Sequence, residues 1–328
     1  MKKLMTAALA ACALATSVTA QAAPTKICVF DIVGNVGPMM GAMKDWQTAA
    51  LGWGLEAELI PYTNEAIAAE DLKAGICDAA LVTGIRGRGF NKFAGTVDSI
   101  GSIPTLDHMR IALQVLSMPQ SAPKLSQGSY QIMGIAPAGA AYIFVNDKEV
   151  NSLAKAAGKR VAVLEYDETQ AKLVSQVGAT PVASDITNFS TKFNNGVVDV
   201  IAAPLAAYEA LELYKGLSPD GGIINYPLVQ LTIQLIAKKD AFTPEVAQKS
   251  REYFYNNLDR ILDQLKKEES KVDSKWWVEI PDADKGEYEV LMQEARNQLK
   301  IEGYYDPDML TLLRKIRCKL DQSRAECT

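Results

Sequence analysis

Two arginines in a glycine-rich stretch are the side chains of this chain best suited to bind a ligand. The stretch Gly84-Ile85-Arg86-Gly87-Arg88-Gly89 follows a run of apolar residues that ends at Thr83. A guanidinium group forms paired, planar hydrogen bonds with a carboxylate or phosphate. We therefore predict that Arg86 and Arg88 lie on a loop and bind an anion, although solvated arginines on a flexible loop fit the pattern equally well. The glycine spacing does not match G-x-G-x-x-G, which argues against dinucleotide binding.

A polar stretch, Glu165-Tyr166-Asp167-Glu168-Thr169, follows a second apolar run, Val161–Leu164. Carboxylates there could accept hydrogen bonds from the end of a ligand that the arginines do not bind, and the phenol could donate or accept one. We predict ligand contacts from Glu165, Tyr166 and Asp167. Together with the arginines they favour a zwitterionic or polar ligand, such as one bearing an amine. The alternative is that these residues only cap a helix.

The chain has a single histidine, His108. This composition argues against histidine-based catalytic triads and against metal sites with several histidines. Hydrolysis by two carboxylates would need both groups to face one pocket, which composition alone leaves open. We predict a binding protein that is not an enzyme and that needs no cofactor or metal ion.

The elements between Asp147 and Gly216 read as three strand-helix units. A helix is expected from Asp147 to the residue before Gly158. The expected strands are 161–164, 180–183 and 197–203. Alternation of this kind predicts a parallel sheet covered by helices, with functional loops at the carboxyl ends of the strands. Pro204 follows the last strand and is a further candidate ligand contact.

The first third of the chain repeats this pattern, with strands expected at 27–32, 55–60 and 77–83. The stretches Gly75-Ile76-Cys77-Asp78 and Gly196-Val197-Val198-Asp199 both have the form G-x-x-D and both precede an apolar run. We interpret this as two α/β lobes built alike. In the first lobe, the residues expected at strand ends are Asn35, Tyr62 and Thr83, and we predict that they contact the ligand.

Two features are expected to connect the lobes. The alternating run Leu228–Lys238 would reach roughly 36 Å if extended, long enough to cross between lobes, and Thr243-Pro244 begins a long amphipathic helix. We predict at least two crossing strands and a helix that contacts both lobes. Lobe I is expected to span 23–138, with 238–265 returning to it. Lobe II is expected to span 139–237, with helices in 266–328 packing across both lobes.

Residues 1–22 have the pattern of a secretory signal peptide. Lys2 and Lys3 precede the apolar stretch Leu4–Val18, and Ala20-Gln21-Ala22 fits a cleavage site. A lipoprotein signal that anchors the protein at Cys12 is the alternative. No later segment is apolar enough to span a bilayer, so direct membrane insertion is not expected. The formal net charge of −5 argues against a nucleic-acid partner.

Four cysteines follow the predicted signal peptide: Cys28, Cys77, Cys318 and Cys327. An even number in an exported protein favours disulfide bonds. We predict the pairs Cys28–Cys77 and Cys318–Cys327, with four free thiols as the alternative.

Three stretches of the chain resemble the periplasmic solute receptors of TRAP transporters. Gly158–Val163 is similar to the family's "DLKGLKIRVP". Val177–Val182 and Asn195–Asp199 resemble "LGATPV" and "GVVDG", and Phe242-Thr243-Pro244-Glu245 resembles "LTPE". These stretches cover a little under a third of the chain. The signal peptide and first lobe further resemble AdeT-like proteins, a divergent branch sometimes labelled as multidrug-efflux components.

The resemblance implies a two-lobed periplasmic-binding-protein fold, with a mostly parallel sheet flanked by helices in each lobe. It further implies a periplasmic receptor that closes on a small ligand and delivers it to a TRAP-type membrane permease. The alternative is a periplasmic accessory of multidrug, including aminoglycoside, efflux.

An arginine of the second lobe usually pairs with the ligand's carboxylate in such receptors. By motif position it would fall at Ala162, whereas this chain has Arg160, about 6.6 Å away along a strand. Either Arg160, Arg86 or Arg88 replaces this contact, or the ligand is not a simple carboxylate.

Overall fold

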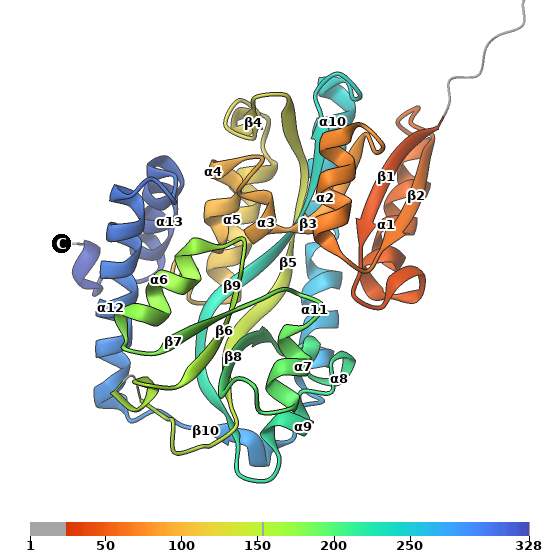
Figure 1. Cartoon of the computed structure of the whole chain (residues 1–328). Coiled ribbons are helices and arrows are strands. Elements are labelled where there is room, and N and C mark those ends of the chain that lie inside the picture. The colour runs from red at the N-terminus through yellow and green to blue at the C-terminus, as the bar shows by residue number, and fades with distance from the viewer. Residues whose placement is uncertain (1–23, 153, 328) are drawn as a thin grey trace, which may run out of the picture.

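The computed structural model describes residues 24–152 and 154–327. The predicted signal peptide and Cys12 lie outside the described residues. The described chain forms two α/β lobes, drawn one above the other in Figure 1, with two long strands that run through both.

Lobe I is built on three parallel strands. These strands are β1 (Thr25–Phe30), β2 (Ala57–Tyr62) and β3 (Ala79–Thr83). The helices of lobe I are α1 (Pro38–Leu51), α2 (Glu65–Ala74), α3 (Gly84–Gly87), α4 (Lys92–Gly95) and α5 (Leu106–Ser117). Trp46, a fully buried residue of α1, packs with Phe30 of β1 in one of the lobe's two apolar cores. The observed strands begin and end within two residues of those expected.

Lobe II repeats the arrangement with β6 in parallel contact with both neighbours. Its strands are β6 (Arg160–Leu164), β7 (Thr180–Ser184) and β8 (Val200–Pro204). Its helices are α6 (Glu168–Gln176), α7 (Phe189–Asn194), α8 (Ala207–Ala210) and α9 (Tyr214–Leu217).

The helix expected from Asp147 is absent from the described part of this segment, which contains only a 3-10 turn at Ala154–Ala156. The carboxylate of Asp147 accepts a hydrogen bond from the backbone N–H of Glu149 at 2.9 Å. Its carbonyl accepts another from Val150 at 3.0 Å. A side chain that bonds its own backbone in this way favours a turn over a helix, so this part of the sequence-based prediction was wrong.

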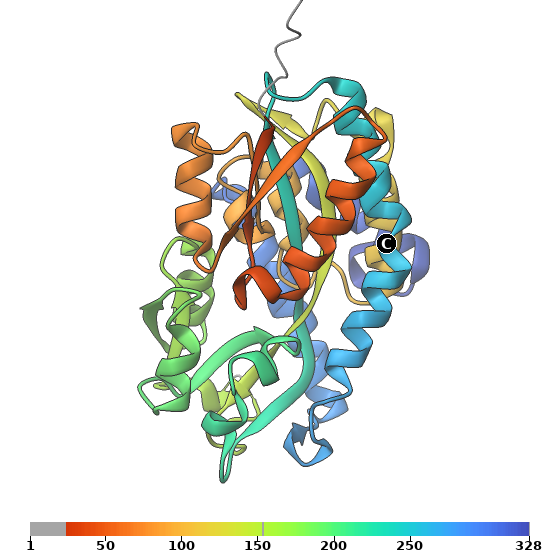
Figure 2. The ribbon, with the colours of Figure 1, turned by 90° about the vertical axis from the view of Figure 1, so that its right-hand side faces the viewer.

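Two long antiparallel strands, β5 (Tyr130–Val145) and β9 (Gly222–Lys238), belong to both lobes. In lobe I, β9 pairs with β3, and in lobe II, β5 pairs with β8. The strand order is β2-β1-β3-β9-β5-β8-β6-β7, with β4 (Ser126–Gln127) and β10 (Trp277–Val278) at its margins. The predicted crossing strands are confirmed. We expected each lobe to have a separate sheet, but these strands join the two into one hydrogen-bonded sheet. Figure 2 shows both strands running the length of the molecule.

The long helix predicted after Thr243 is two helices that follow each other, α10 (Pro244–Asn256) and α11 (Leu258–Glu269). The Thr243 hydroxyl caps α10 by accepting from the Val246 N–H at 3.3 Å. The side-chain amide of Asn257, between the helices, donates to the Tyr253 carbonyl at 2.9 Å, and this residue has non-helical backbone angles. The two helices form a column beside both lobes in Figure 2.

The remaining helices are α12 (Asp282–Ile301) and α13 (Pro307–Leu320). Leu313 of α13 lies in a core of lobe I, and Tyr288 of α12 packs in a core of lobe II. Arg296 of α12 also donates to the Ile100 carbonyl of lobe I at 2.9 Å, so α12 contacts both lobes, while the exact lobe limits stay a prediction. The other 3-10 turns are Gly34–Val36, Thr96–Asp98, Pro119–Ser121, Ser274–Trp276 and Ala325–Cys327.

Both predicted disulfide bonds are present. Cys28 of β1 is bonded to Cys77, and Cys318 to Cys327, with Cα–Cα distances of 5.9 and 5.4 Å. The first bond joins two segments 49 residues apart in the buried core of lobe I.

We expect no reactive thiol at these four positions in exported protein. The measurement is thiol titration of the denatured, unreduced mature chain, and reduction should then release four thiols. Cys28→Ser/Cys77→Ser and Cys318→Ser/Cys327→Ser serve as matched controls, each releasing only two. Four thiols before reduction would refute both bonds.

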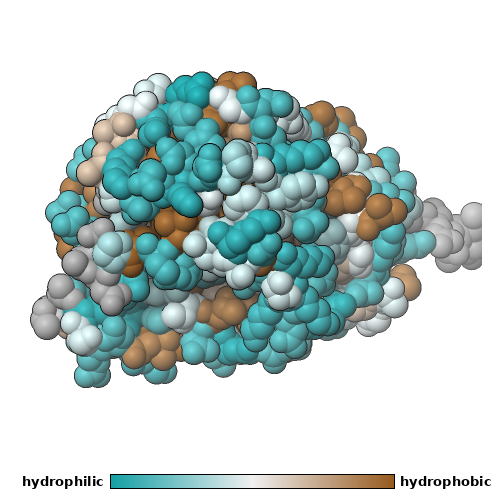
Figure 3. All heavy atoms as spheres, turned by 90° about the horizontal axis from the view of Figure 1, so that it is seen from below, coloured by the Kyte–Doolittle hydropathy of each residue, from teal (hydrophilic) through white to brown (hydrophobic). Residues whose placement is uncertain are grey.

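Within residues 24–152 and 154–327, no helix has the length and apolar character needed to cross a bilayer. Figure 3 views the molecule from below relative to Figure 1 and shows a largely hydrophilic face on which apolar residues are scattered.

Candidate functional site

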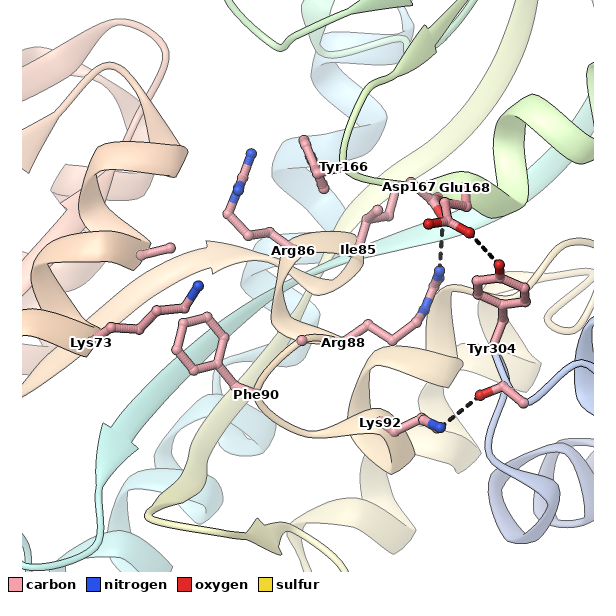
Figure 4. Close-up of a pocket in the computed structure, with 13 residues that line it drawn as sticks. Lys73, Ile85, Arg86, Arg88, Phe90, Lys92, Tyr166, Asp167, Glu168 and Tyr304 are labelled. Carbon is pink, nitrogen blue, oxygen red and sulfur yellow. Dashed lines mark hydrogen bonds and ion pairs between the residues drawn. The ribbon is translucent and has the colours of Figure 1, made fainter.

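A cleft of about 440 Å³ lies where the carboxyl ends of β3 and β6 face each other across the lobes. Arg86 and Arg88 reach it from lobe I, and Tyr166 and Asp167 from lobe II (Figure 4). The other residues that line it are Ala69, Lys73, Ile85, Gly89, Phe90, Lys92, Glu168, Gly303 and Tyr304.

The arginines lie on the short helix α3 and at its end, where we had expected a loop. The Thr83 hydroxyl caps this helix by accepting from the Arg86 N–H at 3.3 Å. A methyl group on Gly84 would come within 2.2 Å of the Thr232 hydroxyl of β9. Here glycine therefore allows α3 to lie directly on β9. The prediction of a loop was wrong because we took the glycines as a sign of a flexible backbone, whereas Gly84 allows α3 to pack closely against β9.

Arg86 contacts Tyr166 and Glu65. Its guanidinium carbon lies 3.7 Å from the centre of the Tyr166 ring, and its Nε lies 3.2 Å from a carboxylate oxygen of Glu65. The same oxygen accepts a hydrogen bond from the Tyr166 hydroxyl, and the other accepts from the Thr83 N–H at 3.1 Å. Burial, followed by the negative charge of Glu65, raises the pKa of Tyr166. The phenol is therefore a hydrogen-bond donor that fixes Glu65 between the lobes.

Arg88 forms an ion pair across the lobes with Asp167, at 3.1 Å between Nη1 and Oδ1. The two side chains are 12 % and 5 % exposed, so little solvent screens the pair. The same oxygen of Asp167 accepts from the N–H and hydroxyl of Thr169 at the start of α6. The Arg88 guanidinium carbon also lies 5.0 Å from the centre of the Tyr305 ring. Asp167 therefore caps α6 and binds lobe I with one carboxylate.

Asp98 is buried beside α3. Its two oxygens accept from the N–H and hydroxyl of Thr232 at 3.0 and 2.6 Å. Burial raises the pKa of Asp98 to about 7, although the hydrogen bonds from Thr232 and the positive charge of Arg88 act in the opposite direction. Ionisation of the Asp98 carboxyl group is therefore unfavourable near neutral pH.

The segment after α12 closes one side of the cleft. The Tyr304 hydroxyl donates to Glu168, and Lys92 Nζ donates to the Gly303 carbonyl at 2.6 Å. A further ion pair joins Lys172 of α6 to Glu302. Residues distant in sequence thus complete the site.

The structure brings four predicted ligand residues to the cleft walls, with Thr83 beside them as the helix cap. Asn35, Tyr62, Arg160, Glu165 and Pro204 are not among the lining residues. Glu165 is exposed. The Tyr62 hydroxyl instead donates to Asp71 at 2.5 Å, and burial raises the pKa of Tyr62 to about 12.

Arg160 lies at the first position of β6, at the end of the strand away from the cleft. It binds Asp199 at 2.6 Å. Hydrogen bonding from Arg160 lowers the pKa of Asp199 to about 2. Arg160 thus has a structural partner at the amino end of the sheet.

Sequence reasoning missed Glu65. This residue lies three positions after the end of β2 and begins α2, with Asn64 as the cap. An acidic residue in a first helical turn usually only complements the helix dipole. Its position at a strand's carboxyl end was the available signal that it belongs to the site.

Among the described residues, no group of three or more His, Cys, Asp and Glu side chains could hold a metal ion. His108 hydrogen-bonds Thr105 through Nδ1 at 2.7 Å and lies outside the cleft, and burial lowers its pKa. The arrangement of charges and donors in the cleft is suited to binding a small polar molecule.

The fold is that of the periplasmic solute-binding proteins of TRAP transporters. The chain is similar to such a protein from Desulfovibrio salexigens with bound orotic acid, at 13% identity and a TM-score of 0.75, over 90% of this chain and 99% of that one. It is also similar to one from Shewanella oneidensis with bound succinate, at 13% identity and a TM-score of 0.73, over 90% and 99%. At this identity the likeness concerns the fold.

The chain belongs to the AdeT 1/2 family of solute-binding proteins, whose model matches residues 53–328. It is 42% identical to probable solute-binding protein AdeT1 of Acinetobacter baumannii, over 91% of this chain and 98% of that protein. It is 30% identical to probable solute-binding protein AdeT2 of the same organism, over 71% and 98%. This is a family of binding proteins rather than enzymes.

Proposed function

We propose that this protein is a periplasmic receptor that binds a small polar ligand with an anionic group in the cleft between its lobes. The observation that carries the proposal is the cleft itself, in which Arg86 and Arg88 of lobe I face Tyr166 and Asp167 of lobe II. A ligand there would touch both lobes at once, as expected for a receptor that closes on its cargo.

The charges of the cleft favour an anion. Lys73, Arg86, Arg88 and Lys92 line it, against only two acidic residues, Asp167 and Glu168, among the described lining residues. Glu165, which we had predicted to bind a donor group of the ligand, is not among them. The carboxylates bound by the structural neighbours, such as orotic acid and succinate, are therefore suitable first probes.

The delivery step is part of the same proposal. A receptor of this fold would hand its ligand to a TRAP-type membrane permease, and the predicted signal peptide would export it to the periplasm. Support comes from the family and the fold; co-purification with the permease from detergent-solubilised membranes is the direct test.

We expect Arg86→Ala and Arg88→Ala each to weaken carboxylate binding by about 30-fold or more, since losing one desolvated charged partner costs about 2–5 kcal/mol. The measurement is calorimetry on the mature protein, after a thermal-shift screen of succinate, orotate, galacturonate and amine-bearing acids.

Arg110→Ala is the matched control, because Arg110 lies on lobe I and pairs with the exposed Asp259. Glu165→Ala tests the sequence-based prediction separately, and the observed geometry predicts unchanged affinity. If both cleft variants bind like the parent, the site is misassigned.

A further inference from the structure

Lobe II has a second hollow, which we call the apolar groove, between α6, α12 and the sheet. Its volume is about 220 Å³. Its walls include Ile143, Val161, Leu173, Val174, Ala202 and Leu291. Among the described lining residues, the groove shares only Ile85 and Asp167 with the interlobe cleft, so the two hollows are neighbours but separate.

The floor of the groove is a part of the sheet that no side chain of the described residues covers. Ala202 lies in β8, which has strands on both sides, and yet Ala202 is exposed. Its neighbours Ile201 and Ala203 are 0 % and 1 % exposed. A strand inside a parallel α/β sheet is normally covered on both faces, so the face of β8 that carries Ala202 has room for a ligand.

The helix above the floor is packed loosely. Thr169 is the one buried residue of α6, whereas Leu173, Val174 and Val177 line the groove and are only partly buried. An amphipathic helix on a sheet normally buries such a stripe. The amino end of α6 is fixed by Asp167 and its ion pair with Arg88, which holds the helix over the groove without filling it.

The groove offers no charge to a ligand. Among its described lining residues, the carboxyl groups are those of Asp98 and Asp167. Asp98 is bonded to Thr232, and Asp167 to Arg88. A charged ligand would lose its hydration among apolar side chains without gaining an ion-pair partner.

We propose that the apolar groove is a binding site for one small, neutral, apolar molecule, about the size of an aromatic ring or a short branched alkyl group. An apolar cavity of about 150 Å³ can already bind benzene, and the groove is larger. Its occupant would pack under α6, the helix that begins at the interlobe ion pair. The proposal does not rest on the function proposed for the interlobe cleft.

Indole and tryptamine, which share a ring system but differ in charge, are the probes. Methyl NMR spectra of the labelled mature protein report on Leu173, Val174 and Val177. We expect indole to shift these signals with a dissociation constant of about 0.1–1 mM, and tryptamine to bind at least about tenfold more weakly.

Ala202→Leu fills the floor of the groove and should abolish the indole shifts. Ala183→Leu is the matched control, because Ala183 is an exposed alanine of β7 outside the groove. Val174→Thr keeps the shape of the side chain but adds a hydroxyl group, and should weaken indole at least about threefold. It decides the matter if Ala202→Leu does not fold.

Equal binding of tryptamine and indole would overturn the neutral-ligand assignment. Shifts that persist unchanged in Ala202→Leu and Val174→Thr would overturn the site. Neither result would affect carboxylate binding, which Arg86→Ala tests separately.

Discussion

Replacing Arg88 by methionine is expected to lower the free energy of unfolding by about 3–5 kcal/mol, the usual cost of leaving one member of a buried ion pair unpaired. Methionine keeps the apolar stem of the side chain but removes the charge. Asp167 would then face lobe I with only its hydrogen bonds from Thr169. The measurement is urea unfolding followed by fluorescence and circular dichroism.

A double-mutant cycle isolates the pair. Asp167→Asn removes the charge while keeping the helix start, because asparagine is as good a cap as aspartate. We expect Arg88→Met/Asp167→Asn to be clearly more stable than the sum of the single losses predicts. The exposed pair Arg110–Asp259 is the control, and its cycle should give about 0.2–1 kcal/mol. Equal coupling in both cycles would show that Arg88 and Asp167 do not hold the lobes together.

The repeated G-x-x-D pattern shows how far the sequence could predict the fold. A carboxylate oxygen of Asp78 accepts from the N–H of Lys26 at 2.8 Å, and one of Asp199 accepts from Arg160 at the same distance. Each aspartate also donates its own N–H to the carbonyl of that partner residue. The same pattern therefore fixes neighbouring strands in both lobes, because local hydrogen bonding depends on residues close to the strand ends.

This local role also explains where Arg160 lies. The G-x-x-D aspartate is at the amino end of the sheet, and Arg160 begins the strand beside it. The cleft residues Tyr166 and Asp167 follow the other end of that strand. A pattern of residue types along a strand does not reveal whether a long side chain lies at the cleft end of the sheet or at its amino end.

The contacts across the lobes could not be predicted from sequence. Glu65 and Arg86 of lobe I meet Tyr166 only because the two lobes approach each other. Of the ligand contacts predicted from residue types at strand ends, four line the cleft and five do not. Which residues of opposite walls pair depends on the orientation of the lobes, which no periodicity encodes.

Asp98 was missed for another reason. It lies in the short 3-10 turn Thr96–Asp98, within a segment of glycines and short helical turns. Nothing in such a segment predicts burial. Its partner Thr232 is 134 residues away, on β9.

The protonation of Asp98 is expected to make the protein less stable as the pH rises towards neutrality. The folded-state pKa of about 7 lies above the ordinary value of 3.8. The folded state therefore holds this proton more tightly than the unfolded state does. The resulting stabilisation is complete below pH 4 and is lost as the pH rises through 7.

The charged groups nearest to Asp98 act in opposite directions. Arg88 favours the ionised carboxyl group, and Asp167 disfavours it. Since those two are themselves paired, burial determines the direction of the shift.

Asp98→Asn removes the titration. We expect the stability difference between the parent and this variant to change by about 3 kcal/mol between pH 5 and pH 8, in favour of the variant. The loss of one acceptor for Thr232 changes the variant's stability at every pH, so only the slope reports protonation. The measurement is a series of urea unfolding curves at constant ionic strength.

Asp199→Asn is the control, because the pKa of Asp199 is lowered to about 2 by Arg160. Its stabilising contribution is present above pH 4 and is lost only in more acidic solution, so its difference curve should be flat from pH 5 to pH 8. A flat curve for Asp98→Asn as well would mean that Asp98 is already ionised at pH 5 in the folded protein. The hydrogen bonds from Thr232 and the charge of Arg88 would then outweigh burial, and α3 would rest on a charged carboxylate.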